Sequence, residues 1–204
     1  VNAGGLSFDV YDFETISKGI TAGDAFLPFD KVLIGTPNHD TLDVAAHAGG
    51  ATTDAYLVLG RGGNDTITGS DGDDILVGEG GTDTLTGGNG NDSFLIGLGD
   101  GPDNFDGGAG TDRILATEDN VSIGIRQHFV TGAVEQISAD GHSGVTLHGS
   151  WDHNHMDFST TTLTGITMIY GEGGNDIITG TNAADTIIGG AGIDTLNGGG
   201  GDDI

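Results

Sequence analysis

The chain of 204 residues contains no cysteine, so neither disulfide bonds nor thiolate metal sites can hold its fold. Basic residues are also scarce, with five against 31 acidic residues, which gives a net charge of −26. Binding of nucleic acid or of an anionic membrane surface relies on clustered lysine and arginine. No such cluster occurs, and no run of about 18 apolar residues is present to span a bilayer. We therefore expect no nucleic acid partner and no membrane insertion.

Glycine, by contrast, is abundant, with 41 residues, and hydrophobic residues make up 35% of the chain. A large charge of one sign ordinarily favours disorder, because the chain repels itself. Here, however, the apolar residues recur at regular spacing. The pattern predicts a folded chain in which bound cations relieve the repulsion between acidic side chains.

A nine-residue pattern runs from Gly60 to Leu115, interrupted once by Ile96 and Gly97, and it returns from Gly171 to Ile204. The sixth position is aspartate in all ten repeats: Asp65, Asp74, Asp83, Asp92, Asp103, Asp112, Asp176, Asp185, Asp194 and Asp203. The eighth position is a large apolar residue: Ile67, Leu76, Leu85, Phe94, Phe105, Ile114, Ile178, Ile187 and Leu196.

Each position of the repeat has a physical role. Glycines at the first, second and fourth positions allow positive φ angles and a tight turn whose carbonyl groups point inward. The aspartate adds a hard, anionic oxygen at the end of the turn. The last three residues form a short strand whose middle side chain, at position eight, faces the interior. One repeat buries a single large side chain, so only stacked coils form a core, and we predict an all-β solenoid.

These repeats resemble the RTX, or haemolysin-type, calcium-binding family, whose pattern is GGxGxDxUx. The resemblance implies a parallel β-roll with two repeats per coil and with calcium held between turns stacked on the same edge. It implies that the ligands are the sixth-position aspartates and backbone carbonyl groups of the turns, including the fourth-position glycines: Gly63, Gly72, Gly81, Gly90, Gly101, Gly110, Gly174 and Gly192.

Turns two repeats apart are expected to share one ion. The predicted partners are Asp65 with Asp83, Asp74 with Asp92, Asp83 with Asp103, Asp92 with Asp112, Asp176 with Asp194, and Asp185 with Asp203. Oxygen ligands of this kind suit Ca²⁺, and the expected total is about six ions, or about eight if degenerate turns contribute. Two turns depart from the pattern, because Ala183 replaces a fourth-position glycine and Pro102 follows the two-residue insertion.

The sequence suggests four segments: residues 1–59 as degenerate coils or a cap, 60–115 as a first repeat block, 116–170 as a β-rich spacer, and 171–204 as a second, truncated block. Upstream, GTPNHDTLD from Gly35, with Asp40, and GGATTDAYL from Gly49, with Asp54, look like decayed repeats. Alternating apolar residues, such as Phe8 with Val10 and Val32 with Ile34, predict strands. The spacer shows no helical period, and we expect parallel coils of longer perimeter there.

Two features of the spacer leave alternatives open. In a strand, His153 and His155 would share one face near Asp152 or Asp157, and they could then bind zinc or copper. Alternatively, they are exposed imidazoles in a polar loop. Trp151, the single tryptophan, could stack on a sugar ring or pack against the fold.

No pair of carboxylates and no nucleophile motif stands out, so we do not expect an enzyme. The resemblance implies a calcium-binding structural module that folds on extracellular calcium after type I secretion, within a large secreted, surface, adhesin-like or S-layer-like protein. The alternative is an accessory module of an extracellular enzyme of the alginate epimerase, protease or lipase type, with polysaccharide contact.

Calcium is the expected partner, together with neighbouring copies or other surface proteins. Both ends look like cuts, which suggests a piece of a larger protein.

Overall fold

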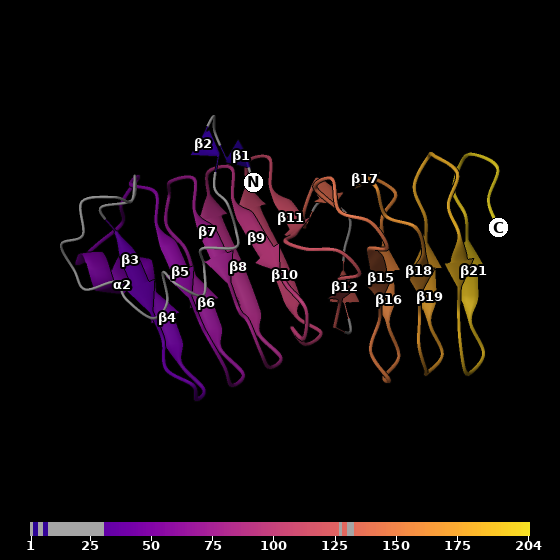
Figure 1. Cartoon of the computed structure of the whole chain (residues 1–204), viewed down its shortest axis with the longest axis horizontal. Coiled ribbons are helices and arrows are strands. Elements are labelled where there is room, and N and C mark those ends of the chain that lie inside the picture. Colours follow the sequence, from indigo (N-terminus) through magenta and orange to yellow (C-terminus); the bar gives the residue numbers. More distant parts are fainter. Residues whose placement is uncertain (1, 4–5, 8–30, 127, 130–132) are drawn as a thin grey trace.

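A computed structural model describes residues 2–3, 6–7, 31–126, 128–129 and 133–204. The strands stack along the long axis of an elongated β-solenoid, from β3 and β4 at one end to β21 at the other (Figure 1). This fold confirms the predicted all-β, parallel solenoid. Within the described residues, one antiparallel pair joins β1 (Asn2–Ala3) and β2 (Leu6–Ser7), and the other strand pairs are parallel. The prediction for Phe8 and Val10 lies outside the described residues.

Two sheets form the first half of the solenoid. One contains β4 (Thr41–Asp43), β6 (Thr66–Thr68), β8 (Thr84–Asn89) and β10 (Asn104–Ala109), in that spatial order. The other contains β3 (Val32–Ile34), β5 (Leu57–Leu59), β7 (Ile75–Val77), β9 (Ser93–Ile96), β11 (Arg113–Ala116), β14 (Gln136–Ser138) and β17 (Thr162–Thr164). This second sheet extends from the first repeat block into the spacer.

Two further sheets form the second half. One contains β12 (Ser122–Gly124), β15 (Thr146–His148), β18 (Ile169–Tyr170) and β20 (Ile187–Ile188). The other contains β13 (His128–Phe129), β16 (His155–Asp157), β19 (Ile177–Thr179) and β21 (Thr195–Asn197). The short helix α2 (Val44–Ala48) follows β4 directly, and no helix of the described residues has the length and apolarity to cross a bilayer.

The length of one coil differs between repeats and spacer. In the repeats, hydrogen bonds join residues 18 apart, as between Asp65 and Asp83. In the spacer the corresponding separations are larger, 23 residues between Asp112 and Glu135 and 27 between Val134 and Thr161. The spacer therefore continues the solenoid with coils of longer perimeter, as its apolar alternation predicted.

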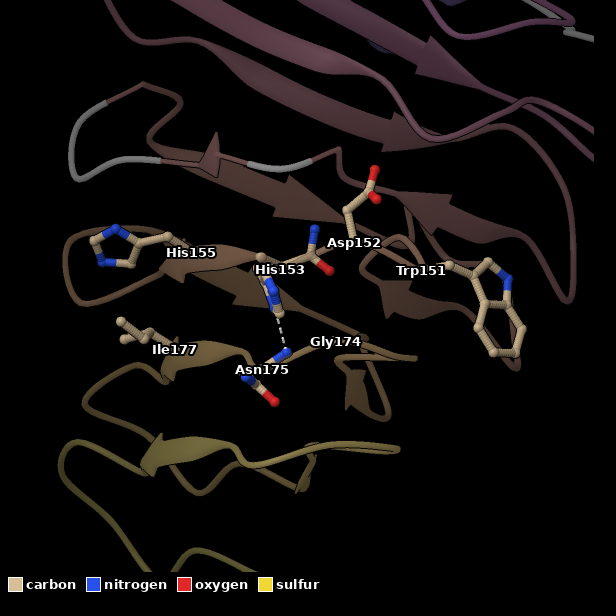
Figure 2. A pocket seen from close by; sticks show the side chains of 8 residues that line it. Trp151, Asp152, His153, His155, Gly174, Asn175 and Ile177 are labelled. Carbon is tan, nitrogen blue, oxygen red and sulfur yellow. Dashed lines mark hydrogen bonds between the residues drawn. The ribbon is translucent and has the colours of Figure 1, made fainter.

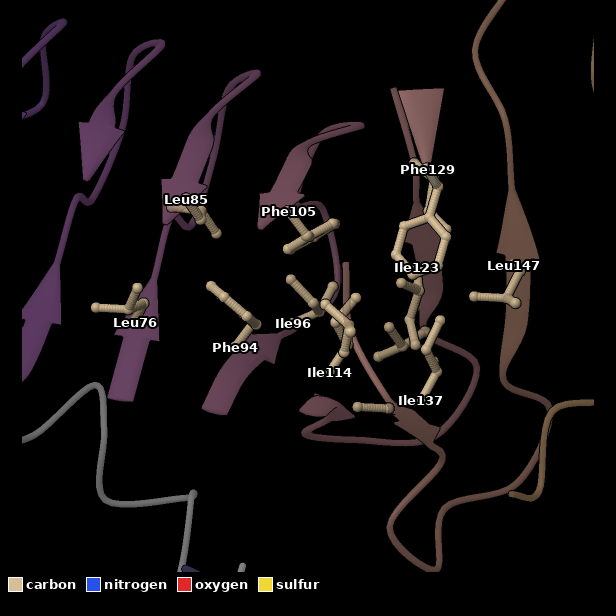
Figure 3. Packing of buried hydrophobic residues seen from close by; sticks show 14 of the residues in the cluster. Leu76, Leu85, Phe94, Ile96, Phe105, Ile114, Ile123, Phe129, Ile137 and Leu147 are labelled. Atoms are coloured by element: carbon tan, nitrogen blue, oxygen red, sulfur yellow. The ribbon is translucent and has the colours of Figure 1, made fainter. Parts of the chain in front are cut away.

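The core is one continuous column of side chains inside the coils. Six eighth-position residues are 0% exposed: Ile67, Leu76, Leu85, Phe94, Ile114 and Ile178. Figure 3 shows this column passing from Leu76 and Phe94 through Ile114 to Ile123 and Leu147 of the spacer. The prediction of a buried eighth position is wrong for Leu196, which is 46% exposed because β21 is the terminal strand of its sheet.

Candidate metal centre in the stacked aspartate turns

The sixth-position aspartates lie above one another in consecutive coils. In six of them the backbone N–H donates to Oδ1 of the aspartate one coil further along. The distances are 2.8 Å from Asp65 to Asp83, 2.7 Å from Asp83 to Asp103, 2.8 Å from Asp74 to Asp92 and 2.8 Å from Asp92 to Asp112. In the second block they are 3.0 Å from Asp176 to Asp194 and 3.0 Å from Asp185 to Asp203. The structure thus brings together the six pairs of turns predicted from the sequence.

We name the four columns of turns by their sixth-position residues. Stack A contains Asp40, Asp65, Asp83 and Asp103; stack B contains Asp74, Asp92 and Asp112; stack C contains Asn154, Asp176 and Asp194; and stack D contains Asp185 and Asp203. The insertion of Ile96 and Gly97 does not disturb the register, because Asp103 still receives the N–H of Asp83.

The second carboxylate oxygen, Oδ2, is buried without a hydrogen-bond partner in six of these aspartates: Asp65, Asp83, Asp92, Asp103, Asp112 and Asp176. All six side chains are nearly inaccessible, at most 2% exposed. A buried carboxylate oxygen with no donor carries a large desolvation cost, so native proteins pair such atoms with hydrogen-bond donors or with metal ions. These six oxygens therefore mark positions for positive charge.

The first-position glycines leave room for a carboxylate oxygen and a carbonyl oxygen to converge. A β-carbon on Gly60 would lie 2.5 Å from Oδ2 of Asp65 and 2.9 Å from the carbonyl oxygen of Gly78 in the next coil. A β-carbon on Gly171 would likewise meet Oδ2 of Asp176 and the carbonyl oxygen of Gly189. Oxygens from two consecutive coils thus face the same small space, which any side chain at the first position would fill.

This arrangement corrects one expectation. The first-position glycines do not have positive φ, so their role is to leave space rather than to allow a left-handed backbone. At the fourth position the expectation of positive φ is confirmed for Gly63, Gly81, Gly90, Gly110, Gly174 and Gly192, but it is wrong for Gly72 and Gly101. Gly101 precedes Pro102, and a residue before proline is held in extended backbone.

Carboxylate and carbonyl oxygens are the ligands that Ca²⁺ prefers, at a coordination number of six to eight. The described residues contain no group of three or more His, Cys, Asp or Glu side chains able to hold a metal. Backbone carbonyl groups would therefore complete any site in these turns, as the ligand set expected from the sequence requires. The residues present fit calcium.

One family model matches the chain, and its description is the RTX calcium-binding nonapeptide repeat. Its four copies fall at residues 59–94, 98–123, 168–182 and 179–204, which include all ten sixth-position aspartates. The chain belongs to the RTX calcium-binding nonapeptide repeat family. No curated protein and no solved structure gives a significant match. The solenoid is accordingly an RTX β-roll, and calcium is the metal its repeats bind.

Burial makes the carboxylates of this RTX roll hard to ionise without a metal. It raises the pKa of Asp92 to about 7 and that of Asp103 to about 8, and repulsion from neighbouring carboxylates adds to both shifts. Burial also raises the pKa of Asp65, Asp74, Asp83, Asp112 and Asp176 above its usual value. Asp100, which was not among the predicted site residues, has a pKa raised to about 7 by burial and by repulsion from Glu79, Asp83 and Glu118.

These shifts predict that acid partly replaces calcium. Because the folded-state pKa lies above the usual value of 3.8, the calcium-free folded chain binds more protons than the unfolded chain between about pH 4 and pH 8. The contribution of these aspartates to stability is therefore fully present below about pH 4 and is lost as the pH rises through 7 to 8. We expect calcium-free chain at pH 5 to show more β-structure by circular dichroism than at pH 8.

A measurement in high salt distinguishes protonation of the buried aspartates from a general reduction of charge repulsion. About 1 M salt screens exposed charges but screens buried carboxylates much less. Calcium-free chain in 1 M salt at pH 8 should therefore remain less structured than chain at pH 5 in low salt. Equal recovery under the two conditions would mean that the net charge, and not the buried aspartates, opposes folding.

Two residues of the stacks were missed from the sequence. The spacer segment 149–157 forms a further turn, in which Asn154 occupies the sixth position and donates its N–H to Oδ1 of Asp176 at 2.8 Å. The sequence features that could have revealed this turn are Gly149 at its first position and the apolar Met156, which is buried, at its eighth. Glu135 follows Asp112 in stack B, where Oε2 accepts the N–H of Asp112 at 2.8 Å. In the sequence, Glu135 stands two positions before the apolar Ile137, which is buried, as a sixth-position aspartate stands before its eighth-position residue.

The upstream repeat with Asp40 is in the predicted phase, because the N–H of Asp40 donates to Oδ1 of Asp65 at 2.8 Å. The phase predicted for the repeat with Asp54 is wrong. Tyr56, rather than Asp54, donates its N–H to Asp74, and Asp54 is exposed and paired with Lys31. The shift arises because α2 lengthens this coil and uses Gly49 as its left-handed C-cap, at φ 80°, so that Gly49 does not start a repeat turn.

The histidines and the tryptophan of segment 149–157 line a pocket of about 630 Å³ (Figure 2). His153 Nδ1 accepts the N–H of Asn175 at 2.6 Å, and no group of three metal-binding side chains forms among the described residues, so the zinc or copper hypothesis gains no support.

Trp151 is 81% exposed, and its ring lies over Gly173, where a β-carbon would come within 3.0 Å. Contact of this ring with a sugar stays a hypothesis.

Proposed function

We propose that this chain is a calcium-controlled folding module of a large secreted or surface protein, of an adhesin-like or S-layer-like kind. The observation that carries the proposal is the set of six buried Oδ2 atoms without partners. In the proposed mechanism the chain stays open at low intracellular calcium, leaves the cell through type I secretion, and folds outside. The residues we assign to binding are the ten sixth-position aspartates and the carbonyl groups of their turns.

The charge and the expected affinity support this order of events. At low calcium, the net charge of −26 and the conformational freedom of 41 glycines both favour the open chain. Extracellular calcium modules bind at roughly 10⁻⁴ to 10⁻³ M, which matches the calcium available outside cells. Calcium therefore acts as both ligand and folding signal, and the repeat blocks 60–115 and 171–204 are the parts that respond. The described residues of segments 31–59 and 116–170 extend the same solenoid on either side of the first block.

The stoichiometry of calcium binding tests the proposal. One orphaned Oδ2 atom per ion predicts about six ions per chain at saturation, measured by equilibrium dialysis or by native mass spectrometry. Magnesium at the same concentration is the control and should occupy few of the sites, because it demands smaller, octahedral geometry and gives up water reluctantly. A chain that binds no calcium, or a single ion, would contradict the proposal.

A further inference from the structure

The turns of this RTX roll occur in two conformations, and the residue at the second position distinguishes them. In one conformation the second residue has positive φ, as at Arg61 (80°), Glu79 (61°), Gly88 (117°), Gly108 (95°) and Glu172 (73°). In the other, the second residue is serine or threonine, and its φ is not positive, as at Thr36, Ser70, Ser150 and Thr181. We call the first conformation open and the second closed.

In the closed turns, the second residue satisfies the oxygen that is orphaned in the open turns. The backbone N–H of Ser70 donates to Oδ2 of Asp74 at 2.5 Å, and its hydroxyl group donates to the same atom at 2.9 Å. Thr181 makes the same two bonds to Oδ2 of Asp185, at 2.6 and 2.9 Å. Thr36 makes them to Oδ2 of Asp40, at 2.6 and 2.8 Å.

The fourth closed turn uses an amide in place of the carboxylate. The N–H of Ser150 donates to Oδ1 of Asn154 at 3.0 Å, and the Asn154 amide donates to the Ser150 hydroxyl at 3.0 Å. Every orphaned Oδ2 atom, by contrast, belongs to an open turn. At this position, three closed turns give Oδ2 two hydrogen-bond donors, the Asn154 turn gives Oδ1 one, and the six open turns with an orphaned Oδ2 give none.

The closed turn also explains the fourth position. The serine or threonine hydroxyl accepts the N–H of the fourth residue, from Gly72 to Ser70 at 3.0 Å and from Ala183 to Thr181 at 3.0 Å. This geometry needs no positive φ at the fourth residue, and neither Gly72 nor Ala183 has one. Ala183 is therefore compatible with its turn, although the repeat pattern places glycine there.

Among the residues that the structure describes, each closed turn is the first nonapeptide turn of its stack: Asp40 begins stack A, Asp74 begins stack B, Asn154 begins stack C and Asp185 begins stack D. The first turn of a stack has a nonapeptide neighbour on one side only. That neighbour is the next coil, and it supplies a carbonyl oxygen as it does at the open turns: a β-carbon on Gly69 would lie 2.6 Å from Oδ2 of Asp74 and closer still to the carbonyl oxygen of Gly87. The first turn therefore differs from the open turns in the donors of its second residue, and not in a missing carbonyl oxygen.

We propose that the second-position serine or threonine caps each calcium stack, so that its amide and hydroxyl groups replace a calcium ion at Oδ2 of the first turn. This inference rests on the proposed function, because it assigns which turns of the roll bind calcium. Closed turns hold no ion through this oxygen, whereas the six open turns with an orphaned Oδ2 do. Capping residues thus set where each row of calcium ions begins.

Arg61 offers a matched test inside stack A. Arg61→Ser supplies the hydroxyl and disfavours positive φ, whereas Arg61→Gly removes the same guanidinium and keeps the turn open. In native mass spectra at saturating calcium, we expect Arg61→Ser to bind one ion fewer than the wild type, and Arg61→Gly to bind the wild-type number. Equal counts for the two variants would overturn the proposal.

Ser70 offers the reverse test, which remains decisive if Arg61→Ser does not fold. Ser70→Gly frees the backbone to open and should add one ion in stack B, whereas Ser70→Ala keeps negative φ and the N–H donor and should add none. An unchanged count in Ser70→Gly would overturn the proposal. A wild-type chain that binds no calcium would instead refute the proposed function, so the two failures are distinguishable.

Discussion

In excess chelator at low salt, the chain should lose most of its β-structure and regain it steeply as calcium rises into the millimolar range. Two carboxylates about 4 Å apart repel by about 4 kcal/mol at an effective dielectric constant of 20. Stacks A to D place carboxylates in consecutive coils, where their repulsion adds to the raised pKa of Asp92 and Asp103, and six of their oxygens are buried without a donor. A typical domain has a total stability of only about 5–15 kcal/mol, so a few unopposed terms of this size unfold it.

Calcium supplies the other half of this expectation through linkage, because an ion that binds only the folded chain stabilises it more as its concentration rises. In the proposed sites consecutive turns share ions, so the sites should fill cooperatively. Far-ultraviolet circular dichroism during a calcium titration measures the transition, and magnesium is the control that should act poorly. A β-rich spectrum that persists unchanged in excess chelator would contradict calcium-controlled folding.

Asp83→Ala should raise the calcium midpoint of folding much more than Asp54→Ala. Asp83 lies in the middle of stack A: its Oδ1 accepts the N–H of Asp65, and its N–H donates to Asp103. Its Oδ2 is buried without a partner, and in the proposed sites the substitution removes a ligand shared with the coils on both sides. A site filled at 100 times its dissociation constant contributes about 2.7 kcal/mol, so losing one or two sites should shift the midpoint several-fold.

Asp54→Ala is the matched control for Asp83→Ala, because it also removes one carboxylate from a turn of the solenoid. Asp54 is exposed, and its partner is the Lys31 ammonium group, a kind of surface ion pair that contributes little to stability. The midpoint should therefore stay close to that of the wild type. Equal shifts for the two variants would show that the assignment of aspartates to the stacks is wrong.

Several features of the site could not be predicted from the repeat pattern. The pattern treats every turn alike, but the closed turns of Ser70 and Thr181 bind their own aspartates and leave no orphaned oxygen. Asn154 and Glu135 were missed because the repeat pattern identifies a sixth-position residue from the residues beside it in sequence. Whether a residue belongs to a stack depends instead on its hydrogen bond to the adjacent coil. That neighbour is 22 or 23 residues away in the spacer, instead of 18.

The sequence by itself determined the fold class, because the apolar eighth position of a nine-residue repeat can only be buried by stacking. The pairing of the aspartate turns followed from the family resemblance, which implies two repeats per coil. Equivalent residues are then 18 apart, as in Asp65 and Asp83, or 20 apart across the two-residue insertion. The tertiary structure alone decided the phase of the coil that carries α2, the exposure of Leu196 and the division into open and closed turns. These depend on coil length, on the neighbouring coil and on backbone φ, which are set by contacts between coils and not by the residues of one repeat.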